Sequence, residues 1–505
     1  MNPLKKLASE TVWYGMSSIG VRFLNYLLTP LLTYLMHDAS GVRDYGDYSL
    51  VYVWIALANI VFTYGLETGY FRFSNKEGVK KDKLYNTSLS SLVVSSTLLF
   101  LTIFLFKDSI NDFLGLQGPA LYITWCGMII GLDAVNTIPF AKLRQESRPK
   151  KYAFIKIGGV LINIIGVVTF MVFIPKWNAE PDALPIVQWL GAQNSVGLLI
   201  LSNVIQNVVV TLLLLKEWRQ WKLEFDKKLW LDIMRYSSPM IIIGLAGMVN
   251  EVMDRQLLSS YLPLSEEDSK RIVGIYSANY KLAIFITLFI QAFRMAAEPF
   301  FFNQAKDKNA PKVYADVMKW FVITMCFAFL FTILFIDIWK YLIGSSYRSG
   351  LPIVSILLLS NIFLGIYYNL SVWYKITDKM RMGIYITVAG MIVTLVGNIV
   401  FIPYYGMFAA AYTTLACYGL MMVLAYVIGQ KHFPVPYNVK KIVALITTSL
   451  LFFGVHSLLT FWTSKDWWSV LVGAFLFLLF ARFILFIEKE YLKKVPFVKR
   501  IYRKN

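Results

Sequence analysis

The sequence predicts an all-α polytopic membrane protein with fourteen transmembrane helices, arranged as two pseudo-symmetric six-helix lobes followed by two additional C-terminal helices. Three observations lead to this fold class. Hydrophobic residues make up 57% and charged residues 16% of the 505 positions, whereas about 25% charged residues is usual in soluble chains. Apolar segments long enough to cross a bilayer recur along the whole chain. Short motifs of the first half return in the same order in the second half.

Each predicted span is an apolar segment of about 20 residues, the length that a helix needs to cross a hydrocarbon core about 30 Å thick. In chain order we predict spans at residues 11–36, 48–67, 88–106, 120–143, 152–174, 196–215, 234–262, 272–296, 318–338, 351–373, 382–402, 407–428, 442–461 and 468–487. The longest external loop, 175–195, has no predicted structure of its own. We therefore expect no catalytic domain outside the membrane.

The distribution of basic residues predicts the orientation. Most of the 49 Lys and Arg residues fall in the two terminal segments and in the loops after even-numbered spans, and the other loops hold few. Because cytoplasmic loops carry the excess of Lys and Arg, we expect both termini in the cytoplasm. The net charge of +19 is then explained by topology and by contact with anionic lipids rather than by nucleic acid.

An internal repeat is visible as motifs that return at a nearly constant spacing. The matches are 46–49 with 274–277, 173–175 with 401–403, and Glu67 with Glu298, at offsets of 228, 228 and 231 residues. Six spans separate the copies, so both enter the membrane in the same direction and the pseudo-twofold axis lies along the membrane normal. We predict an N-terminal six-helix lobe at 1–228, a second lobe at 229–430, and two additional helices with a basic cytoplasmic tail at 431–505.

Three segments carry a resemblance to a known family. Residues 398–411, Asn-Ile-Val-Phe-Ile-Pro-Tyr-Tyr-Gly-Met-Phe-Ala-Ala-Ala, resemble the hairpin between helices eleven and twelve of bacterial polysaccharide flippases. The opening, from 11–15 through 28–35, is similar to the first helix of that family, and Tyr-Gly-Asp-Tyr at 45–48 to the start of its second. These lipid-linked oligosaccharide and O-antigen flippases belong to the multidrug/oligosaccharidyl-lipid/polysaccharide superfamily.

The resemblance implies a flippase rather than an enzyme. Such a protein moves a polyprenyl-diphosphate-linked oligosaccharide from the cytoplasmic to the outer leaflet of the bacterial inner membrane by alternating access, for surface polysaccharide biosynthesis. Its implied partners are the glycan lipid, membrane lipids, and a polysaccharide polymerase or glycosyltransferases. The related lipid II flippase uses arginines in helices one, two and eight. Arg22 and Arg294 match two of these, but helix two has only Arg72 at its cytoplasmic exit, which argues against lipid II itself as the substrate.

Polar and charged residues form lines along the spans. An ionisable residue at a helix centre costs about 2.5–3.5 kcal/mol, so most of them must face one another or a wet cavity. Residues three or four apart share a helix face, and spans one, two, seven and eight, two from each lobe, hold the richest lines. We therefore predict a cavity between the lobes. Its predicted substrate-binding residues are Arg22, Asn25, Arg255, Lys281, Gln291, Arg294 and Glu298.

Three acids are candidates for coupling transport to protons, sodium ions or the membrane potential: Asp133, Glu251 and Asp254. The chain has no GxxxxGK[ST] phosphate loop, and we expect no cofactor or metal. Structural alternatives remain open for two of the acids. Glu251 and Arg255, four residues apart with the acid first, also suit an ion pair within one helix. Asp133 with Asn136 also suits a hydrogen-bonded pair between helices.

Other polar and aromatic residues have structural alternatives too. Lys281 lies near the outer end of its span and can snorkel to the interface. Lys156 and Glu67 lie near cytoplasmic ends, where they suit interface anchors. The aromatic residues at 367–374 in the tenth span suit either stacking on sugar rings or the more common interfacial belt.

Two further function classes share the composition. A multidrug exporter has the same fold and is the main alternative, but we expect it to have a more acidic cavity that attracts cationic drugs. A membrane glycosyltransferase or polymerase would need catalytic acids, and Asp38, Asp44 and Asp47 are of that kind. We interpret these three as ordinary acids of a solvated loop. Moving a glycan through hydrocarbon costs several kcal/mol per unpaired hydroxyl, so a flippase must supply a hydrated groove with cations for the diphosphate.

Overall fold

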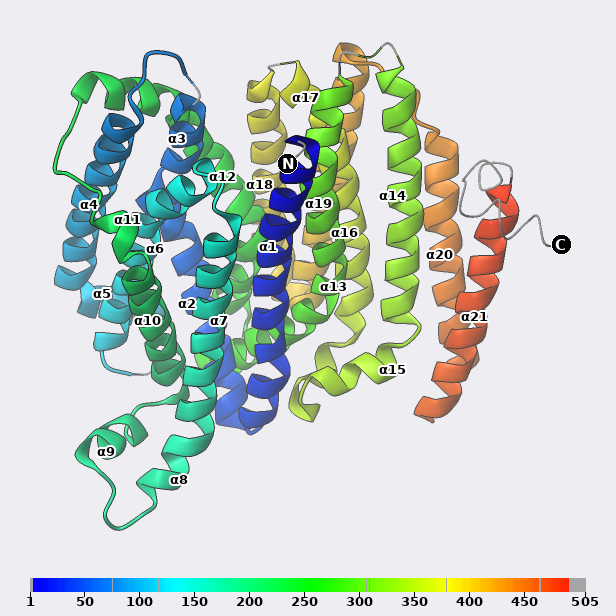
Figure 1. The fold of residues 1–505 in the computed structure, drawn as a ribbon. Helices are drawn as coiled ribbons and strands as arrows, with labels where there is room; N and C mark the ends of the chain where they lie inside the picture. Colours follow the sequence, from blue (N-terminus) through cyan, green and yellow to red (C-terminus); the bar gives the residue numbers. More distant parts are fainter. Residues whose placement is uncertain are drawn as a thin grey trace.

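The structure is a computed structural model that describes residues 3–74, 76–116, 118–305, 307, 309–377, 379–462 and 465–489. Within these ranges it leaves the side chains of residues 3–18, 284, 285, 296, 298, 299 and 303 undescribed. Every regular element in the described part of the chain is a helix (Figure 1). The predicted all-α class is therefore confirmed.

The first eleven α-helices and one π-helical turn are α1 (Pro3–Leu35), α2 (Ala39–Thr63), α3 (Leu66–Ser74), α4 (Lys81–Leu105), α5 (Lys107–Leu114), α6 (Leu121–Gln145), α7 (Pro149–Val168), the π turn Thr169–Phe173, α8 (Ile174–Asn178), α9 (Pro185–Gly191), α10 (Ser195–Leu213) and α11 (Leu215–Trp218). The next eight are α12 (Lys227–Tyr261), α13 (Glu266–Gln304), α14 (Ala310–Ile333), α15 (Ile336–Trp339), α16 (Pro352–Leu370), α17 (Val372–Ile376), α18 (Met380–Tyr405) and α19 (Met407–His432). Helices α20 (Val439–Thr460) and α21 (Asp466–Ile487) follow.

Eleven helices in the described residues are long and apolar enough to cross a membrane. Helix α13 makes a twelfth when its two parts, Glu266–Ala283 and Ile286–Phe302, which meet at an angle of 51°, are counted as one span. Helices α1 and α12 lie where spans were predicted but are not among these helices. A polytopic membrane protein with eleven to twelve such helices is established, whereas the count of fourteen remains a prediction.

Two predicted loops are partly helical. Helix α2 begins at Ala39, where Asp38 caps it by accepting a hydrogen bond from the Gly41 backbone N–H at 2.8 Å. The interpretation of Asp44 and Asp47 as acids of a solvated loop is therefore wrong, because both lie on α2 and both are buried. The loop at 175–195 was predicted to have no structure, yet it contains α9 and most of α8.

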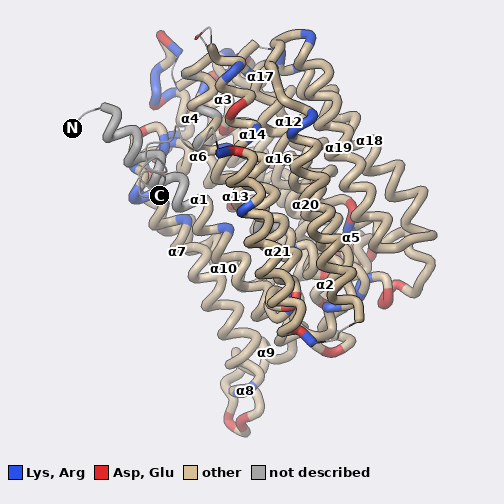
Figure 2. The backbone as a smooth tube through the Cα atoms, turned by 90° about the vertical axis from the view of Figure 1, so that its right-hand side faces the viewer, with Lys and Arg blue, Asp and Glu red and all other residues tan. Residues whose placement is uncertain are grey.

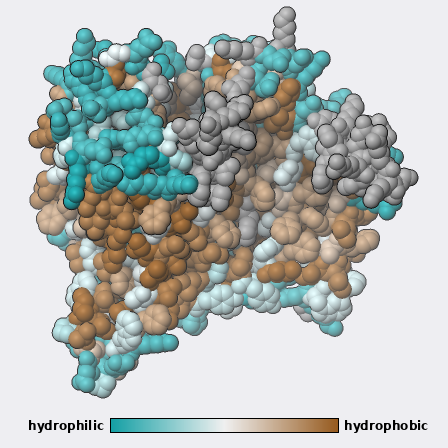
Figure 3. Space-filling model, in the orientation of Figure 1, coloured by the Kyte–Doolittle hydropathy of each residue, from teal (hydrophilic) through white to brown (hydrophobic). Residues whose placement is uncertain are grey.

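The surface has an apolar band between two hydrophilic ends (Figure 3). Lys and Arg gather at the end that carries α3 and α17 (Figure 2), including Lys76 and Lys80 before α4, Lys81 at its start, and Lys150 and Lys151 at the start of α7. We name this the basic end. The opposite end carries α8, α9 and α15 (Figure 1).

Helix packing in the second half of the chain repeats that of the first half. In the first half α1 packs on α7, α4 on α6, α6 on α10 and α7 on α10. In the second half α12 packs on α18, α14 on α16, α16 on α19 and α18 on α19. Each pair recurs six long helices later, which is the arrangement that a six-helix repeat about an axis along the membrane normal produces. The division into lobes at 1–228 and 229–430 remains a prediction.

The two halves meet where α2 crosses α13, toward the opposite end. The motif matches at 46–49 and 274–277 place Gly46 and Gly274 at equivalent positions, and these two glycines face each other at the crossing. A side chain on Gly46 would collide with the Lys270 carbonyl and lie 3.2 Å from the Gly274 nitrogen, and one on Gly274 would collide with the Val42 carbonyl. Glycine at both positions therefore lets the two backbones touch.

Helices α20 and α21 pack outside this arrangement, on α14 (Figure 1). The residue after α21, Glu488, joins them at the basic end, where it is buried against Lys319 of α14 at 3.2 Å and against Lys441 of α20. Burial raises the pKa of the Glu488 carboxyl, but the hydrogen bonds from Lys441 and Lys319 outweigh burial, so its pKa lies below the ordinary value.

Replacing Glu488 tests this joint. Glu488→Gln is expected to lower the melting temperature of the detergent-solubilised protein at pH 7, because two lysines lose the charge that they share. The pKa of Glu488 is lowered in the folded state. The stability that its carboxylate adds is therefore present above the unfolded-state pKa of about 4.3 and is lost as the pH falls through the folded-state pKa. Melting curves near pH 7 and near pH 3 measure it. Glu77→Gln, at an exposed acid, is the control, and equal melting of Glu488→Gln and wild type at pH 7 would contradict the assignment.

Candidate functional site

A polar cavity lies between α1 of the first half and the helices of the second half. Its volume is ≈ 200 Å³. The lining residues are Arg22, Asn25 and Tyr26 of α1; Glu251 of α12; Tyr280, Lys281, Thr287, Leu288, Ile290 and Gln291 of α13; Asn361, Leu364 and Tyr368 of α16; and Tyr418 of α19. Four of the seven predicted substrate-binding residues, Arg22, Asn25, Lys281 and Gln291, therefore line one cavity.

The polar line on α1 explains how that helix presents its side chains. Arg22, Asn25, Thr29 and Thr33 lie three or four residues apart and so share one face. Arg22 and Asn25 line the cavity, while Thr33, nearer the opposite end, is buried and accepts a hydrogen bond from the Gly344 backbone N–H at 3.1 Å. One face of α1 thus serves the cavity along part of its length and a contact between the two halves along the rest.

The cavity carries an excess of positive charge. Arg22 and Lys281 line it against one carboxylate, that of Glu251. A third cation, the guanidinium of Arg294, lies 4.2 Å from the ring centre of Tyr368, which forms part of the wall. Among the side chains that the structure describes, none of these three cations has a carboxylate within ion-pair distance. Within the described part of the chain, the charges of Arg22 and Lys281 on the wall are therefore available to a ligand.

Arg255 and Asp254, both predicted for the site, instead form a buried structural cluster. The Arg255 guanidinium lies 3.2 Å from the Asp254 carboxylate and 4.3 Å from the ring centre of Tyr280. The other carboxylate oxygen of Asp254 accepts a hydrogen bond from the Tyr276 hydroxyl at 2.6 Å. The predicted alternative of a Glu251–Arg255 ion pair is not formed. The contact of Arg255 with Glu251 is instead a hydrogen bond from the guanidinium to the Glu251 backbone carbonyl, at 3.1 Å.

The remaining predicted residues lie elsewhere. Asp133 of α6 lies within the electrostatic reach of Lys156 of α7, inside the first half and away from the cavity. The Asn136 side chain donates to Thr211 at 2.7 Å and accepts from Trp218 at 3.1 Å, so Asn136 joins helices, whereas the choice between the two roles predicted for Asp133 stays open. The side chain of Glu298 lies outside the described residues.

Helix α2 adds no residue to the cavity wall among the described residues, although its polar line suggested that it would. Tyr52 of α2 instead receives a hydrogen bond from Asn203 of α10, and Arg72 on α3 stacks on the Tyr236 ring at 4.3 Å. The wall gains Asn361 and Tyr418, which the sequence reasoning missed. Asn361 is a polar residue within an apolar span, and that signal could have found it. No comparable signal marks Tyr418.

The aromatic group of the tenth span divides between wall and core. Tyr368 lines the cavity. Tyr367, Trp373 and Tyr374 are buried, and Trp373 donates to the Ala425 carbonyl of α19 at 3.1 Å. Only Tyr368 is therefore placed to stack on a ligand, and the other three hold helices together.

The chain matches the model of a known protein family. The model of the polysaccharide biosynthesis protein family matches residues 7–305, more than half of the chain. The chain belongs to this family. No curated protein matches it in sequence. The predicted family is thereby confirmed.

Solved structures show the same fold at low sequence identity. A lipid II flippase, MurJ, in an inward closed conformation is 16% identical, with a TM-score of 0.70 over 94% of this chain and 99% of that one. A multidrug resistance transporter of the MATE family in an inward-facing conformation is 14% identical, with a TM-score of 0.61 over 87% and 96%. The MATE multidrug transporter DinF-BH is 14% identical, with a TM-score of 0.59 over 85% and 95%. The chain thus has the same membrane transporter fold as a flippase and two drug transporters.

Substitution of the ion-paired Arg255 and of the cavity residue Arg22 is expected to change the stability of the protein to different extents. Arg255→Met leaves the buried Asp254 without its cation, which costs about 3–5 kcal/mol for a buried pair. Arg22→Met removes a cation that pairs with no described carboxylate and should leave folding unchanged. Thermal unfolding of both purified variants in detergent measures the difference. Equal melting temperatures for the two would show that Arg255 is not the structural one.

Proposed function

We propose that this protein is a flippase that moves a polyprenyl-diphosphate-linked oligosaccharide from the cytoplasmic to the outer leaflet by alternating access of its two halves, for surface polysaccharide biosynthesis. The observation that carries the proposal is the cavity's excess of positive charge. Among the side chains that the structure describes, Arg22, Lys281 and Arg294 outnumber Glu251, the acid on the wall. Family membership and the fold shared with a lipid II flippase support it.

The cavity matches the chemistry of a sugar diphosphate. One cation about 4 Å from one phosphate charge gains about 4 kcal/mol at an effective dielectric of 20, before desolvation. Asn25, Gln291 and Asn361 supply amide donors and acceptors for sugar hydroxyls. A volume of ≈ 200 Å³ suits the diphosphate end of the substrate in this conformation rather than a whole glycan.

Two alternatives fit the cavity less well. A multidrug exporter shares the fold, but a cationic drug would meet two or three cations and one carboxylate. A glycosyltransferase or polymerase would need catalytic acids. Of the three considered for that role, Asp38 caps α2, Asp44 pairs with Arg43 of the same helix, and Asp47 is buried against Lys270 of α13. Transport of an anionic lipid headgroup is the better match.

The proposal includes an energy source and partners. Of the three acids considered for coupling, only Glu251 lines the cavity. We therefore assign it the exchange of a proton or sodium ion, or a response to the membrane potential. Polymerases and glycosyltransferases would supply and consume the glycan lipid on the two sides of the membrane.

Export of surface polysaccharide tests the proposal directly. In a flippase-deficient strain, Arg22→Ala or Arg294→Ala is expected to abolish export with normal amounts of inserted protein, and Lys at either position is expected to retain part of it. Arg235→Ala is the matched control, because that arginine is on α12 and 80% exposed. Full export by both alanine variants would contradict the role of Arg22 and Arg294 in substrate binding. Loss of resistance to cationic compounds with unchanged polysaccharide would favour the drug exporter.

The proposed topology has fourteen spans in the bacterial inner membrane, with the basic end and both termini in the cytoplasm. Single cysteines at Glu77, in the basic loop before α4, and at Asp182, between α8 and α9, test it in a background without the three native cysteines. A membrane-impermeant maleimide applied to whole cells with a permeabilised outer envelope should label Asp182→Cys only. Labelling of Glu77→Cys alone would invert the topology.

A further inference from the structure

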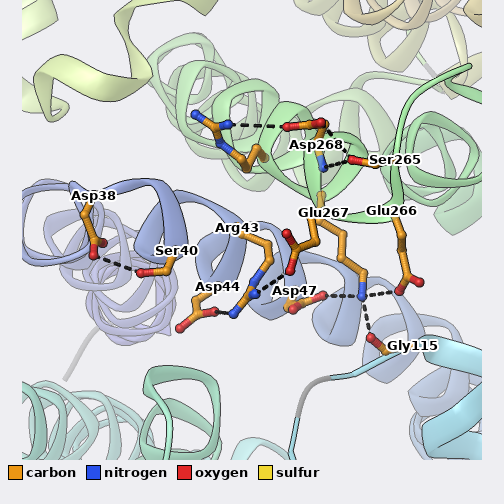
Figure 4. Close-up of polar contacts among 12 residues, drawn as sticks. Asp38, Ser40, Arg43, Asp44, Asp47, Gly115, Ser265, Glu266, Glu267 and Asp268 are labelled. Carbon is orange, nitrogen blue, oxygen red and sulfur yellow. Dashed lines mark hydrogen bonds and ion pairs between the residues drawn. The ribbon is translucent and has the colours of Figure 1, made fainter.

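Two basic residues tie the halves together at the end opposite the basic one (Figure 4). Lys270 of α13 lies with its amino group 3.2 Å from the Asp47 carboxylate of α2 and 2.7 Å from that of Glu266, and it also donates to the Gly115 carbonyl beyond α5. Arg43 of α2 lies 2.8 Å from Asp44 and 3.2 Å from Glu267 of α13. Two ion pairs therefore join α2 to α13. In one the acid lies on α2 and the base on α13, and in the other the base lies on α2 and the acid on α13.

We propose that this cluster is an external gate, in which Lys270 closes the cavity to the outer face of the membrane and must leave Asp47 when the protein opens outward. The proposal rests on the alternating access of the proposed function. It assigns a role to residues that lie outside the cavity and that the substrate does not contact.

The position of Lys270 supports a seal. Its side chain is 4% exposed and that of Asp47 is 2% exposed, so water is excluded between α2 and α13 at this depth. The Gly46–Gly274 contact lies beside it, on the turn that follows Lys270. Lys270 precedes Lys281 by eleven residues, which is about 16 Å along the helix. The seal thus lies outward of the cavity rather than within it.

The chemistry of the contact supports a gate rather than a permanent joint. A buried ion pair gains little over two hydrated charges, because the desolvation penalty offsets most of the attraction. Asp47 and Lys270 would recover hydration when the helices part, so separation costs less than exposing an apolar seam of the same area. Charged residues at this crossing therefore allow two states of similar free energy.

A second, uncharged contact lies beside the cluster. The loop before α16 holds the outer end of α1, where the Tyr347 hydroxyl donates to the Met36 carbonyl at 2.6 Å. Lys270 is thus one of several contacts that close this end, and its removal shifts an equilibrium instead of unfolding the protein.

Accessibility of the cavity from outside tests the gate without any substrate. The reporter is Asn25→Cys on the cavity wall, in a background where Cys126, Cys326 and Cys417, all buried, are replaced by Ser. A membrane-impermeant maleimide is applied to whole cells with a permeabilised outer envelope. Lys270→Gln leaves Asp47 buried without a cation when the gate is closed, which should raise the rate of labelling by at least about tenfold.

Three further variants complete the test. Asp47→Asn should raise the rate as Lys270→Gln does, and Lys270→Arg, which keeps the charge, should leave it near the parent value. Arg271→Gln is the matched control, since the neighbouring Arg271 is exposed and pairs only within α13, with Asp268 at 3.3 Å. Folding of each variant is checked by its melting temperature in detergent.

Parent-like labelling of folded Lys270→Gln and Asp47→Asn would overturn the gate, and so would faster labelling from the cytoplasmic side alone. Neither result would touch the proposed function, which rests on export by the Arg22 and Arg294 variants. Conversely, if the export experiments contradicted the flippase, a gate demonstrated by cysteine labelling would still stand.

Discussion

The crossing of α2 and α13 is the contact on which the rest of the architecture depends. The two helices hold equivalent places in the repeat, and their glycines Gly46 and Gly274 meet with no room for a side chain. A contact between equivalent positions lies on the axis that relates the two halves. It brings the halves together toward one end, so that the polar cavity between α1 and the second half lies on the inner side of that contact.

Electrostatics then decides what each charge within the helices does. Arg255 is neutralised by Asp254 and covered by Tyr280, and it belongs to the framework. Lys270 bridges the halves. Arg22 and Lys281 line the cavity, and none of the described carboxylates pairs with them. Since an unpaired charge in hydrocarbon is costly, the cations left over must face water or an anionic ligand, and the cavity is where that condition is met.

The sign of the cavity charge separates functions that the fold does not separate. A lipid II flippase and a multidrug transporter match the chain with TM-scores of 0.70 and 0.61 at 16% and 14% identity, a likeness that shows architecture alone. Membership of the polysaccharide biosynthesis family and the excess of cations among the described wall residues are the two observations that support the proposal of an anionic glycan lipid as substrate. The fold thus indicates a transporter, the family indicates polysaccharide biosynthesis, and the charge of the cavity favours an anionic ligand.

The sequence by itself determined the all-helical membrane class, most span positions and the polar face of α1, because hydropathy and helical period are local properties. It predicted Arg22, Asn25, Lys281 and Gln291, which the structure brings to one cavity. It could not separate Arg255 from them, nor show that Asp47 is buried against Lys270. Ion pairs between helices depend on which faces meet, and only the tertiary packing of α2, α12 and α13 decided whether a membrane charge supports the fold, joins the two halves at the end opposite the basic one or faces the cavity.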